Sequence, residues 1–506
     1  MNKYLSAFAV YADKRMLVLF LLGLFSGLPP ALIFSSLSLW LSEAGVTLET
    51  VTMFSWAGLA YSFKFVWAPL IDSLPVPVLS GLLGKRRAWL LVSQVSVAAA
   101  VCWMAEVDPR QAGVLPYMAA AAVLLGFSSA TQDIVIDAYR IETAGSNAAT
   151  QSATSASYTA GYRIGMIVSG AGVLYLAQNL GSTLQVYTYA AWRQTYLLMA
   201  AVMAAGILTT LLIKEPEASI RIGKENKHTA SDNLRLALLF VSAVAGFVSA
   251  FVWLGGTLPK ADGVLGRLGV EAVRLTGALL VASLVGALLV RAGAIRKQLA
   301  LDTWVLPVMD FFSRYGRTAA LLLALIGLYR ISDIVAGVIA NVFYKDMGFD
   351  KKEIADAVKT FGMVMAIAGG FVGGALLQRF ALMKMMMAGA VLASATNLLF
   401  IGLAYRGHDL VFMYFAVGFD NLASGLAGAV FVAFLSELTN VRFTAVQYAV
   451  LSSLMTLLPK TLGGYSGAIV KNIGYPSFFL FTALLGLPVL LLVYWADKGL
   501  CRQRDV

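Results

Sequence analysis

Residues 126–140 read G-F-S-S-A-T-Q-D-I-V-I-D-A-Y-R and close an apolar run that begins near Leu115. On a helix, Asp133, Asp137 and Arg140 are spaced i, i+4 and i+7, so they share one face. Ionisable groups inside a membrane span are costly and must face a partner or a water-filled cavity. We therefore expect Asp133 and Asp137 to take part in proton coupling. The alternative for Asp137 is that Arg140 only neutralises it near the cytoplasmic end of the span.

The composition around this stretch indicates an all-α polytopic membrane protein. The chain has 506 residues, is 59% hydrophobic and 13% charged, and has a mean hydropathy of +0.79. Apolar runs of about 20 residues, long enough to cross a bilayer as helices, recur from end to end. The net charge of +11 does not indicate nucleic-acid binding, because the basic residues cluster in short loops. Both histidines fall in predicted loops, so a proton relay within the membrane must use carboxylates.

Internal similarity divides the chain into two halves. W-L-S-E-A-G-V-T-L-E-T-V after the first span resembles F-Y-K-D-M-G-F-D-K-K-E-I later on, and G-F-S-S at 126 resembles Gly418-Phe419-Asp420-Asn421. Two six-span halves in parallel repeat are the plan of a major facilitator transporter. We predict fourteen spans, with two extra transmembrane helices between the halves. The expected domains are 1–213, 318–506, and 214–317 for the cytoplasmic connector, the extra helices and an interfacial helix.

Loop charges predict the orientation of the chain. Basic residues precede the first span, follow the second and sixth, precede the seventh core span and close the chain, all on one side. Cytoplasmic loops are enriched in Lys and Arg, so both termini are expected in the cytoplasm.

Polar residues predicted at membrane depth form the candidate substrate site. Sites in such repeats lie between the halves near the midplane, and cations around a cavity there suit a solute that bears carboxylates. One alternative is that Arg330 and Asp333, which are i, i+3, only neutralise each other. Another is that the aromatic residues only pack, instead of stacking on sugar rings. The candidates are Lys64, Tyr61, Arg163, Tyr162, Arg330, Asp333, Asn421 and Lys460.

Sequence patterns of covalent catalysis and nucleotide binding are absent from the sequence. It contains no H-E-x-x-H, no G-x-S-x-G and no P-loop pattern. We therefore expect a transporter and not an enzyme, with no cofactor and no metal. Uphill transport would then use an ion gradient, with the proton as the coupling ion and sodium as the alternative.

Several motifs resemble the AmpG-type muropeptide permeases, a family of the major facilitator superfamily. They are F-S-G-L-P-P-A-L in span 1, F-S-W-A-G-L-A-Y-S-F-K-F-V-W-A-P-L-I-D in span 2, S-A-T-Q-D-I-V-I-D-A-Y-R in span 4 and L-Y-R-I-S-D in the seventh core span. The resemblance implies proton-driven import of anhydromuropeptides, which are N-acetylglucosaminyl-anhydro-N-acetylmuramyl peptides. It also implies a multi-pass protein of the bacterial inner membrane, with roles in cell-wall (peptidoglycan) recycling and beta-lactamase induction.

The resemblance also implies roles for individual residues. Asp133 and Asp137 match the two aspartates of the family's fourth span, which are linked to transport and proton coupling. A cytoplasmic gate is expected where Asp72 and the segment Gly84–Arg87 look like the superfamily's loop between spans 2 and 3. The candidate gate residues are Asp72, Lys85, Arg86, Arg87 and Arg140. The expected partners are a small-molecule substrate and membrane lipids, with no nucleic acid, and the protein is expected to be a monomer.

Two alternatives to this function remain open. The first is a major facilitator transporter of another anionic solute such as acetyl-coenzyme A, because related transporters share features of these motifs and a cationic cavity also holds phosphates. The second is a membrane protein that does not transport, such as a receptor or an embedded enzyme. The absence of catalytic motifs and the similarity between the halves argue against the second.

Overall fold

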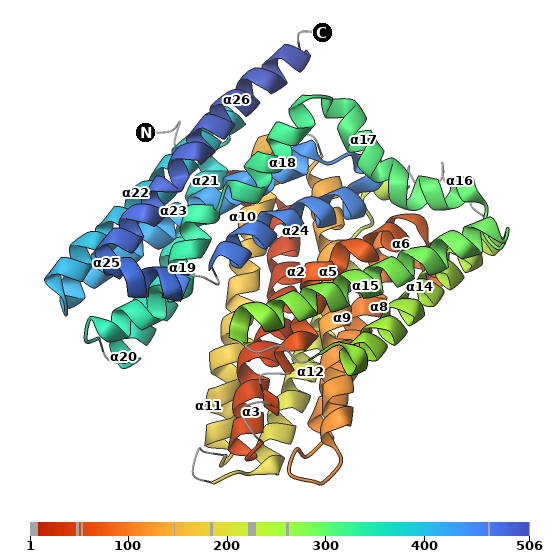
Figure 1. Ribbon diagram of the computed structural model, residues 1–506, viewed down its shortest axis with the longest axis horizontal. Helices are drawn as coiled ribbons and strands as arrows, with labels where there is room; N and C mark the ends of the chain where they lie inside the picture. The colour runs from red at the N-terminus through yellow and green to blue at the C-terminus, as the bar shows by residue number, and fades with distance from the viewer. Residues whose placement is uncertain are drawn as a thin grey trace.

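The first half of the chain folds into helices that cross the molecule repeatedly (Figure 1). The computed structural model describes residues 9–46, 50–51, 54–145, 147–182, 186–220, 229–259, 263–349, 351–463 and 466–504. The helices of the first half are η1 (Ala9–Ala12), α2 (Lys14–Ala31), η2 (Leu32–Ser36), α3 (Leu37–Glu43), η3 (Phe54–Gly58), α5 (Leu59–Phe63), η4 (Lys64–Val66), α6 (Ala68–Ser73), α7 (Leu79–Leu83), α8 (Lys85–Ala105), α9 (Leu115–Ala144), α10 (Ala148–Ile167), η5 (Val168–Gly172), α11 (Val173–Asn179) and α12 (Tyr189–Leu212).

The second half repeats this pattern and splays away from the first (Figure 1). Its helices are α18 (Thr318–Leu328), α19 (Ile331–Asp346), α20 (Lys351–Ile354), η7 (Ala355–Phe361), α21 (Gly362–Leu376), α22 (Leu382–Arg406), α23 (Leu410–Leu438), η8 (Val441–Phe443), α24 (Thr444–Gly463), α25 (Ser466–Leu484) and α26 (Gly486–Arg504).

A helical hairpin and a bent amphipathic segment connect the halves. The hairpin is α14 (Ala230–Thr257) with α15 (Gly263–Arg291), and the segment is α16 (Lys297–Ala300), η6 (Leu301–Val305) and α17 (Leu306–Tyr315). The hairpin leaves Val241, Val248 and Val252 exposed. This exposure suits a helix that faces lipid, because lipid solvates apolar side chains.

The predicted count of fourteen spans is not confirmed by the structure. Eleven stretches among the described residues are long and apolar enough to cross a membrane, so the count of fourteen is not confirmed by this criterion. The predicted second span is divided into η3, α5, η4 and α6, each too short to be counted. One counted stretch joins parts of two predicted spans across Gly474, whose φ of 76° breaks the helix. The multi-pass helical class is nevertheless confirmed.

Glycines let helices within each half approach backbone to backbone. In the first half, a Cβ on Gly23 or Gly27 of α2 would strike a carbonyl oxygen of α10, and one on Gly161 or Gly165 of α10 would strike a carbonyl of α2. In the second half, Gly369 of α21 and the facing helix α23 have the same relation. Small residues at such contacts are the usual means by which membrane helices pack closely.

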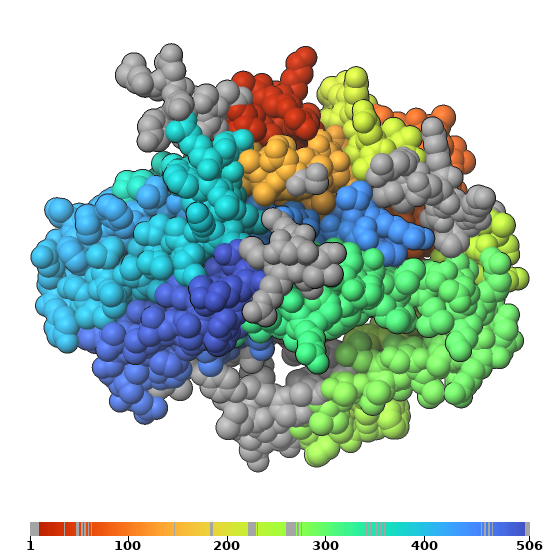
Figure 2. Space-filling model, turned by 90° about the horizontal axis from the view of Figure 1, so that it is seen from above, coloured from red at the N-terminus to blue at the C-terminus, as the bar shows by residue number. Residues whose placement is uncertain are grey.

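The two halves touch at the face where α6 and α9 end and where α10 and α24 begin, which we call the closed face. The Tyr11 hydroxyl donates to the carbonyl of Phe371 at 3.0 Å. A Cβ on Gly370 would lie 3.9 Å from the Ala156 side chain, and one on Gly374 would lie 3.4 Å from Ala153. Seen from above, the orange region where α9 passes into α10 lies against cyan and blue segments of the second half (Figure 2). The sequence predicts this face to be cytoplasmic.

The close approach of α2 and α10 predicts the effect of Gly161→Ala. The added methyl group would strike the carbonyl oxygen of Phe20, so the two helices must move apart. Overpacking of this kind costs about 1–3 kcal/mol, so we expect a lower melting temperature and yield in detergent.

The matched control is Gly337→Ala, because a Cβ at that position has no heavy atom within 4 Å. Alanine is a better helix former than glycine, so the control should be as stable as the wild type or slightly more so. Equal melting temperatures for the two variants would contradict the packing account.

Candidate functional site

The first half buries a carboxylate among hydroxyl groups. Asp133 of α9 accepts a hydrogen bond from Ser26 of α2, and the Ser26 hydroxyl also lies 3.3 Å from that of Tyr158 on α10. The side chains of Ser26 and Asp133 are buried. Asp133 thus lies where three helices of the first half meet. Because hydroxyl groups can donate to an ionised carboxylate or accept from a protonated one, both charge states can be hydrogen-bonded there.

One turn further along α9, Asp137 lies between two cations. One carboxylate oxygen is 3.6 Å from the Lys64 ammonium, and the other is 3.7 Å from the Arg140 guanidinium. The sequence alone left open whether Arg140 only neutralises Asp137. In the structure Arg140 does more, because it also reaches Ser436 of α23 at 3.1 Å and packs over the Tyr448 ring of α24 at 5.1 Å.

The two candidate tyrosines belong to the same cluster. The Tyr61 hydroxyl donates to Ser129 at 2.7 Å, one turn of α9 before Asp133. The Tyr162 ring lies 6.0 Å from the Tyr158 ring. Asp133, Asp137, Lys64, Tyr61 and Tyr162 are therefore gathered on one side of the interface between the halves.

The second half holds a separate polar cluster at the junction of α18 and α19. Arg330 forms an ion pair with Asp333, as their spacing allowed. The Ser424 hydroxyl of α23 lies 3.0 Å from both partners, accepting from Arg330 and donating to Asp333. One turn earlier on α23, Asp420 accepts a hydrogen bond from Thr396 of α22 at 2.8 Å.

A cavity of about 90 Å³ lies between the two halves, and an arginine from each half lines it. Arg163 comes from α10, and Arg330 comes from the junction between α18 and α19. Small residues, including Ala156, Gly370 and Gly425, form much of the remaining wall. Arg163 makes no hydrogen bond or ion pair with any described residue. Two guanidinium groups facing one cavity in a medium of low dielectric constant favour the binding of an anion.

Two other candidates are not among the described residues that line this cavity. The amide nitrogen of Asn421 donates to the carbonyl of Val417 in its own helix at 2.9 Å, and it packs against Gly362. Lys460 is on α24, but its side chain lies outside the described residues. The structure therefore brings Arg163, Arg330 and Asp333 together and places Asn421 in a packing contact.

The predicted gate residues form a charged network at the closed face. Arg86 is buried and pairs with Glu142 at 2.6 Å and with Asp72 at 2.8 Å. Its neighbour Arg87 donates to the carbonyls of Thr210 and Leu211 at the end of α12. Arg86 and Arg87, in the first turn of α8, thus hold together the ends of four helices of the first half.

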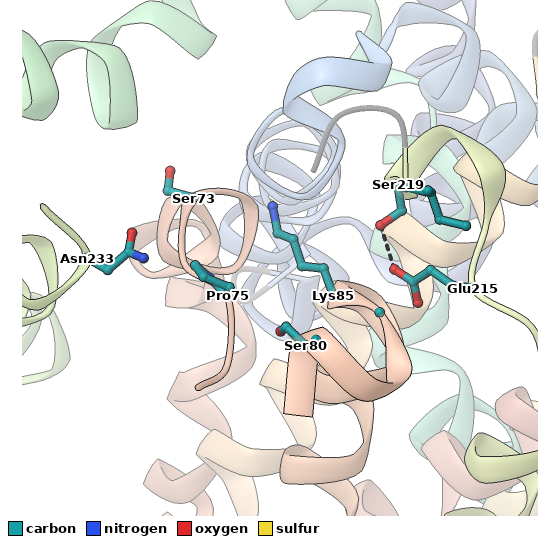
Figure 3. Close-up of a pocket in the computed structure, with 10 residues that line it drawn as sticks. Ser73, Pro75, Ser80, Lys85, Glu215, Ser219 and Asn233 are labelled. Carbon is teal, nitrogen blue, oxygen red and sulfur yellow. Dashed lines mark hydrogen bonds between the residues drawn. The ribbon is translucent and has the colours of Figure 1, made fainter. Parts of the chain in front are cut away.

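The Asp72 carboxylate also reaches the other half of the molecule. It accepts a hydrogen bond from the backbone N–H of Val446, in the first turn of α24, at 3.0 Å. The Lys85 ammonium donates to the Asp72 carbonyl. The Lys85 side chain also borders a cavity of about 360 Å³, which Glu215 and Ser219, joined by a hydrogen bond, line as well (Figure 3). Asp72 and Arg140 are thus the two candidate gate residues that contact both halves.

The sequence analysis did not identify several partners in these networks. Glu142 and Glu215, which bind the Arg86 side chain and the N-terminus of α8, were not singled out because nothing in their spacing marks them. Ser26, Thr396 and Ser424 could not be recognised, since hydroxyl residues are common in membrane helices. Within the part of the chain that the structure describes, no group of three His, Cys, Asp or Glu is placed to hold a metal ion.

Comparisons with known proteins identify similar transporters. The chain is 31% identical over 495 residues to the anhydromuropeptide permease of Escherichia coli, covering 98% of this chain and 81% of that protein. It is 29% identical over 488 residues to AmpG 4 of Rickettsia conorii, covering 96% and 98% of the two chains. A family model described as acetyl-coenzyme A transporter 1 matches residues 15–212.

Solved structures of major facilitator transporters share the fold. The proton:xylose symporter XylE matches with a TM-score of 0.60 and 13% identity, covering 96% of each chain. The transporter FucP in its outward conformation matches with a TM-score of 0.54 and 13% identity, covering 97% of this chain and 99% of that one.

The position of Asp72 predicts that Asp72→Ala opens the closed face. The variant leaves the N–H of Val446 without its acceptor and removes one of the two carboxylates that neutralise the buried Arg86. Breaking a buried pair costs about 3–5 kcal/mol. A cysteine placed at Ala153, next to Gly374 of the other half, should therefore react faster with a membrane-impermeant maleimide.

The labelling would use inside-out vesicles and a background in which Cys102 and Cys501 are replaced by serine. Asp302→Ala is the control, because Asp302 accepts a hydrogen bond from Gln298 on the exposed surface of the amphipathic segment. Labelling rates that are the same for Asp72→Ala and for this control would exclude Asp72 from the gate.

Proposed function

The chain belongs to the AmpG-type muropeptide permeases of the major facilitator superfamily, and from this premise we propose that it imports anhydromuropeptides by proton symport. The proposed movement is from the periplasm to the cytoplasm, by a monomer with both termini in the cytoplasm. The observation that carries the proposal is the cavity between the halves, which is lined by Arg163 and Arg330. Such a cavity suits the carboxylates of a muropeptide, because guanidinium groups bind carboxylates with charge-assisted hydrogen bonds.

Transport would proceed by alternating access of this cavity to the two sides of the membrane. In the structure the contacts between the halves include those of Tyr11, Asp72 and Arg140 at the closed face. Import requires that these contacts break after the substrate has entered. A ligand can shift this equilibrium only through its different affinities for the two states.

Asp133 is the proposed proton carrier. Its carboxylate lies one turn from Asp137, whose second oxygen neighbours Arg140, and Arg140 contacts the second half. A proton on Asp133 removes a negative charge next to the ion pair of Lys64 and Asp137. Its arrival therefore changes the electrostatic balance of the group that holds the closed face, which is a physical route from protonation to gating.

The remaining candidates complete the proposed substrate site. The two arginines hold the peptide carboxylates, and Asp333 orients Arg330. Tyr61 and Tyr162 offer aromatic faces to the sugars. Lys64 is the weakest candidate for direct substrate contact, because Asp137 already neutralises it.

A second candidate cargo is acetyl-coenzyme A. The match of residues 15–212 to the acetyl-coenzyme A transporter family favours it, and the phosphates of that molecule would also bind to arginines. The similarity to the E. coli permease extends over 98% of the chain, and for this reason we place the muropeptide first.

Replacement of the proton carrier provides the first functional test. Asp133→Asn keeps an acceptor for Ser26 but cannot bind and release a proton, so accumulation of labelled anhydromuropeptide should be abolished. The uptake would be measured in cells that lack their own permease. Asp13→Asn is the control, since Asp13 is an exposed residue that caps α2 and asparagine can replace it there. Wild-type accumulation by Asp133→Asn would remove Asp133 from the coupling role.

Competition distinguishes the two cargoes. In proteoliposomes that contain the purified protein, excess unlabelled disaccharide peptide should suppress uptake of the labelled muropeptide, whereas coenzyme A and acetyl-coenzyme A should not. Suppression by the coenzyme A compounds, without suppression by the disaccharide peptide, would favour the second cargo.

A further inference from the structure

The carboxylate of Asp420 has no part in the mechanism described above. It is half-buried on α23, and its hydrogen bond among the described residues comes from Thr396 at 2.8 Å. It forms no ion pair with any described residue. Ser424 follows it by one turn and bridges Arg330 and Asp333. Residues spaced i, i+4 share a helix face, so Asp420 lies one turn of α23 from Ser424, which lines the cavity between the halves.

The ionisable groups that face Asp420 come from two helices and their junction. Arg330 and Asp333 are near it at the junction of α18 and α19, and the phenol of Tyr344 faces it from α19. Thr396 on α22 contributes only its hydroxyl group. Among the described residues, Arg330 is thus the cation that lies near both Asp333 and Asp420.

Among the described residues in and next to the cavity, the formal charges balance when no anion is bound. Arg163 and Arg330 contribute two positive charges, and Asp333 and Asp420 contribute two negative charges. An anion between the arginines would leave one uncompensated negative charge in a medium of low dielectric constant, which is unfavourable. A proton on one of the carboxylates restores neutrality. Asp333 already pairs with Arg330 and accepts a hydrogen bond from Ser424, whereas Asp420 has no ion pair among the described residues, so we assign the proton to Asp420.

We propose that Asp420 is a second proton-binding site, and that it takes up its proton when a carboxylate of the substrate binds between Arg163 and Arg330. The proposal rests on the proposed function, and it adds a proton site in the second half to the one at Asp133. No covalent bond changes: the carboxylate enters as an anion, a proton from water joins Asp420, and both leave on the cytoplasmic side.

The size of the cavity limits the part of the substrate that it can accept. A bound water needs roughly 10–15 Å³ of such volume, so about 90 Å³ holds a carboxylate and a few waters but not a sugar ring. A free inorganic anion such as phosphate or chloride has the same charge chemistry. The experiment below therefore tests both sources of the anion.

Thermodynamic linkage between proton binding and substrate binding determines how strongly the dissociation constant should depend on pH. If binding of the substrate adds one proton to Asp420, then loss of that proton with rising pH must weaken binding by the same coupling. One linked proton changes the dissociation constant by about tenfold per pH unit in the range where the free site is deprotonated. Asp420→Asn imitates the protonated, neutral form, so it should remove one proton from this dependence.

The test measures proton uptake when labelled anhydromuropeptide binds to the purified full-length protein in a weakly buffered solution with a pH indicator. We expect Asp420→Asn to bind the muropeptide and to take up about one proton fewer than the wild type. The plot of log Kd against pH should lose about one unit of slope. Asp409→Asn, at the exposed N-terminus of the same helix, should behave like the wild type, because asparagine can replace the capping carboxylate.

A second experiment, in which the substrate and not the protein is changed, keeps the proposal testable if Asp420→Asn does not fold. A muropeptide whose peptide carboxylates are converted to amides should bind to the wild type with about one proton fewer. An unchanged proton count, either for this analogue or for Asp420→Asn, would overturn the proposal. Proton uptake caused by phosphate or chloride alone would overturn the assignment of the site to the substrate. If the wild type does not bind the muropeptide, the failure lies in the proposed function and not in the role of Asp420.

Discussion

The low dielectric constant of the membrane interior requires that every buried charge have a partner, and this requirement organises the site. The first half satisfies this requirement internally. Asp133 accepts a hydrogen bond from a hydroxyl group, and Asp137 lies between Lys64 and Arg140. The boundary between the halves is different, because Arg163 has no partner among the described residues and faces Arg330 across one cavity. Two guanidinium groups on one cavity are the physical basis for expecting an anionic solute there.

Two charged residues of the first half, Arg140 and Asp72, also contact the second half at the closed face. Arg140 binds Asp137 within its own helix and Ser436 in the opposite half, and Asp72 binds Arg86 and the backbone of Val446. Each residue takes part both in the electrostatic balance of the first half and in the contact between the halves. Loss of the negative charge on Asp72 or on Asp137 would change both sets of contacts at once, which is the proposed link between protonation and the gate.

Much of this arrangement could be predicted from the sequence, and the reasons are physical. Apolar runs and loop charges indicated a polytopic helical protein, and the i, i+4 spacing placed Asp133 and Asp137 on one face of α9. The pairing of Arg330 with Asp333 also followed from spacing. Partners from distant helices could not be predicted from spacing, because the contacts of Glu142 and Ser424 depend on tertiary packing. The division of the second span into short helices was hidden as well, since a mostly apolar stretch of this length is typical of a single transmembrane helix.

The most direct measurement is uptake of a labelled anhydromuropeptide by the purified protein in proteoliposomes with an imposed pH gradient, acid outside. Proton symport through a charged cavity between the halves requires that the solute accumulate above its external concentration, and that a protonophore abolish the excess. Uptake that only reaches equilibrium, or that is unaffected by the protonophore, would contradict proton-driven import.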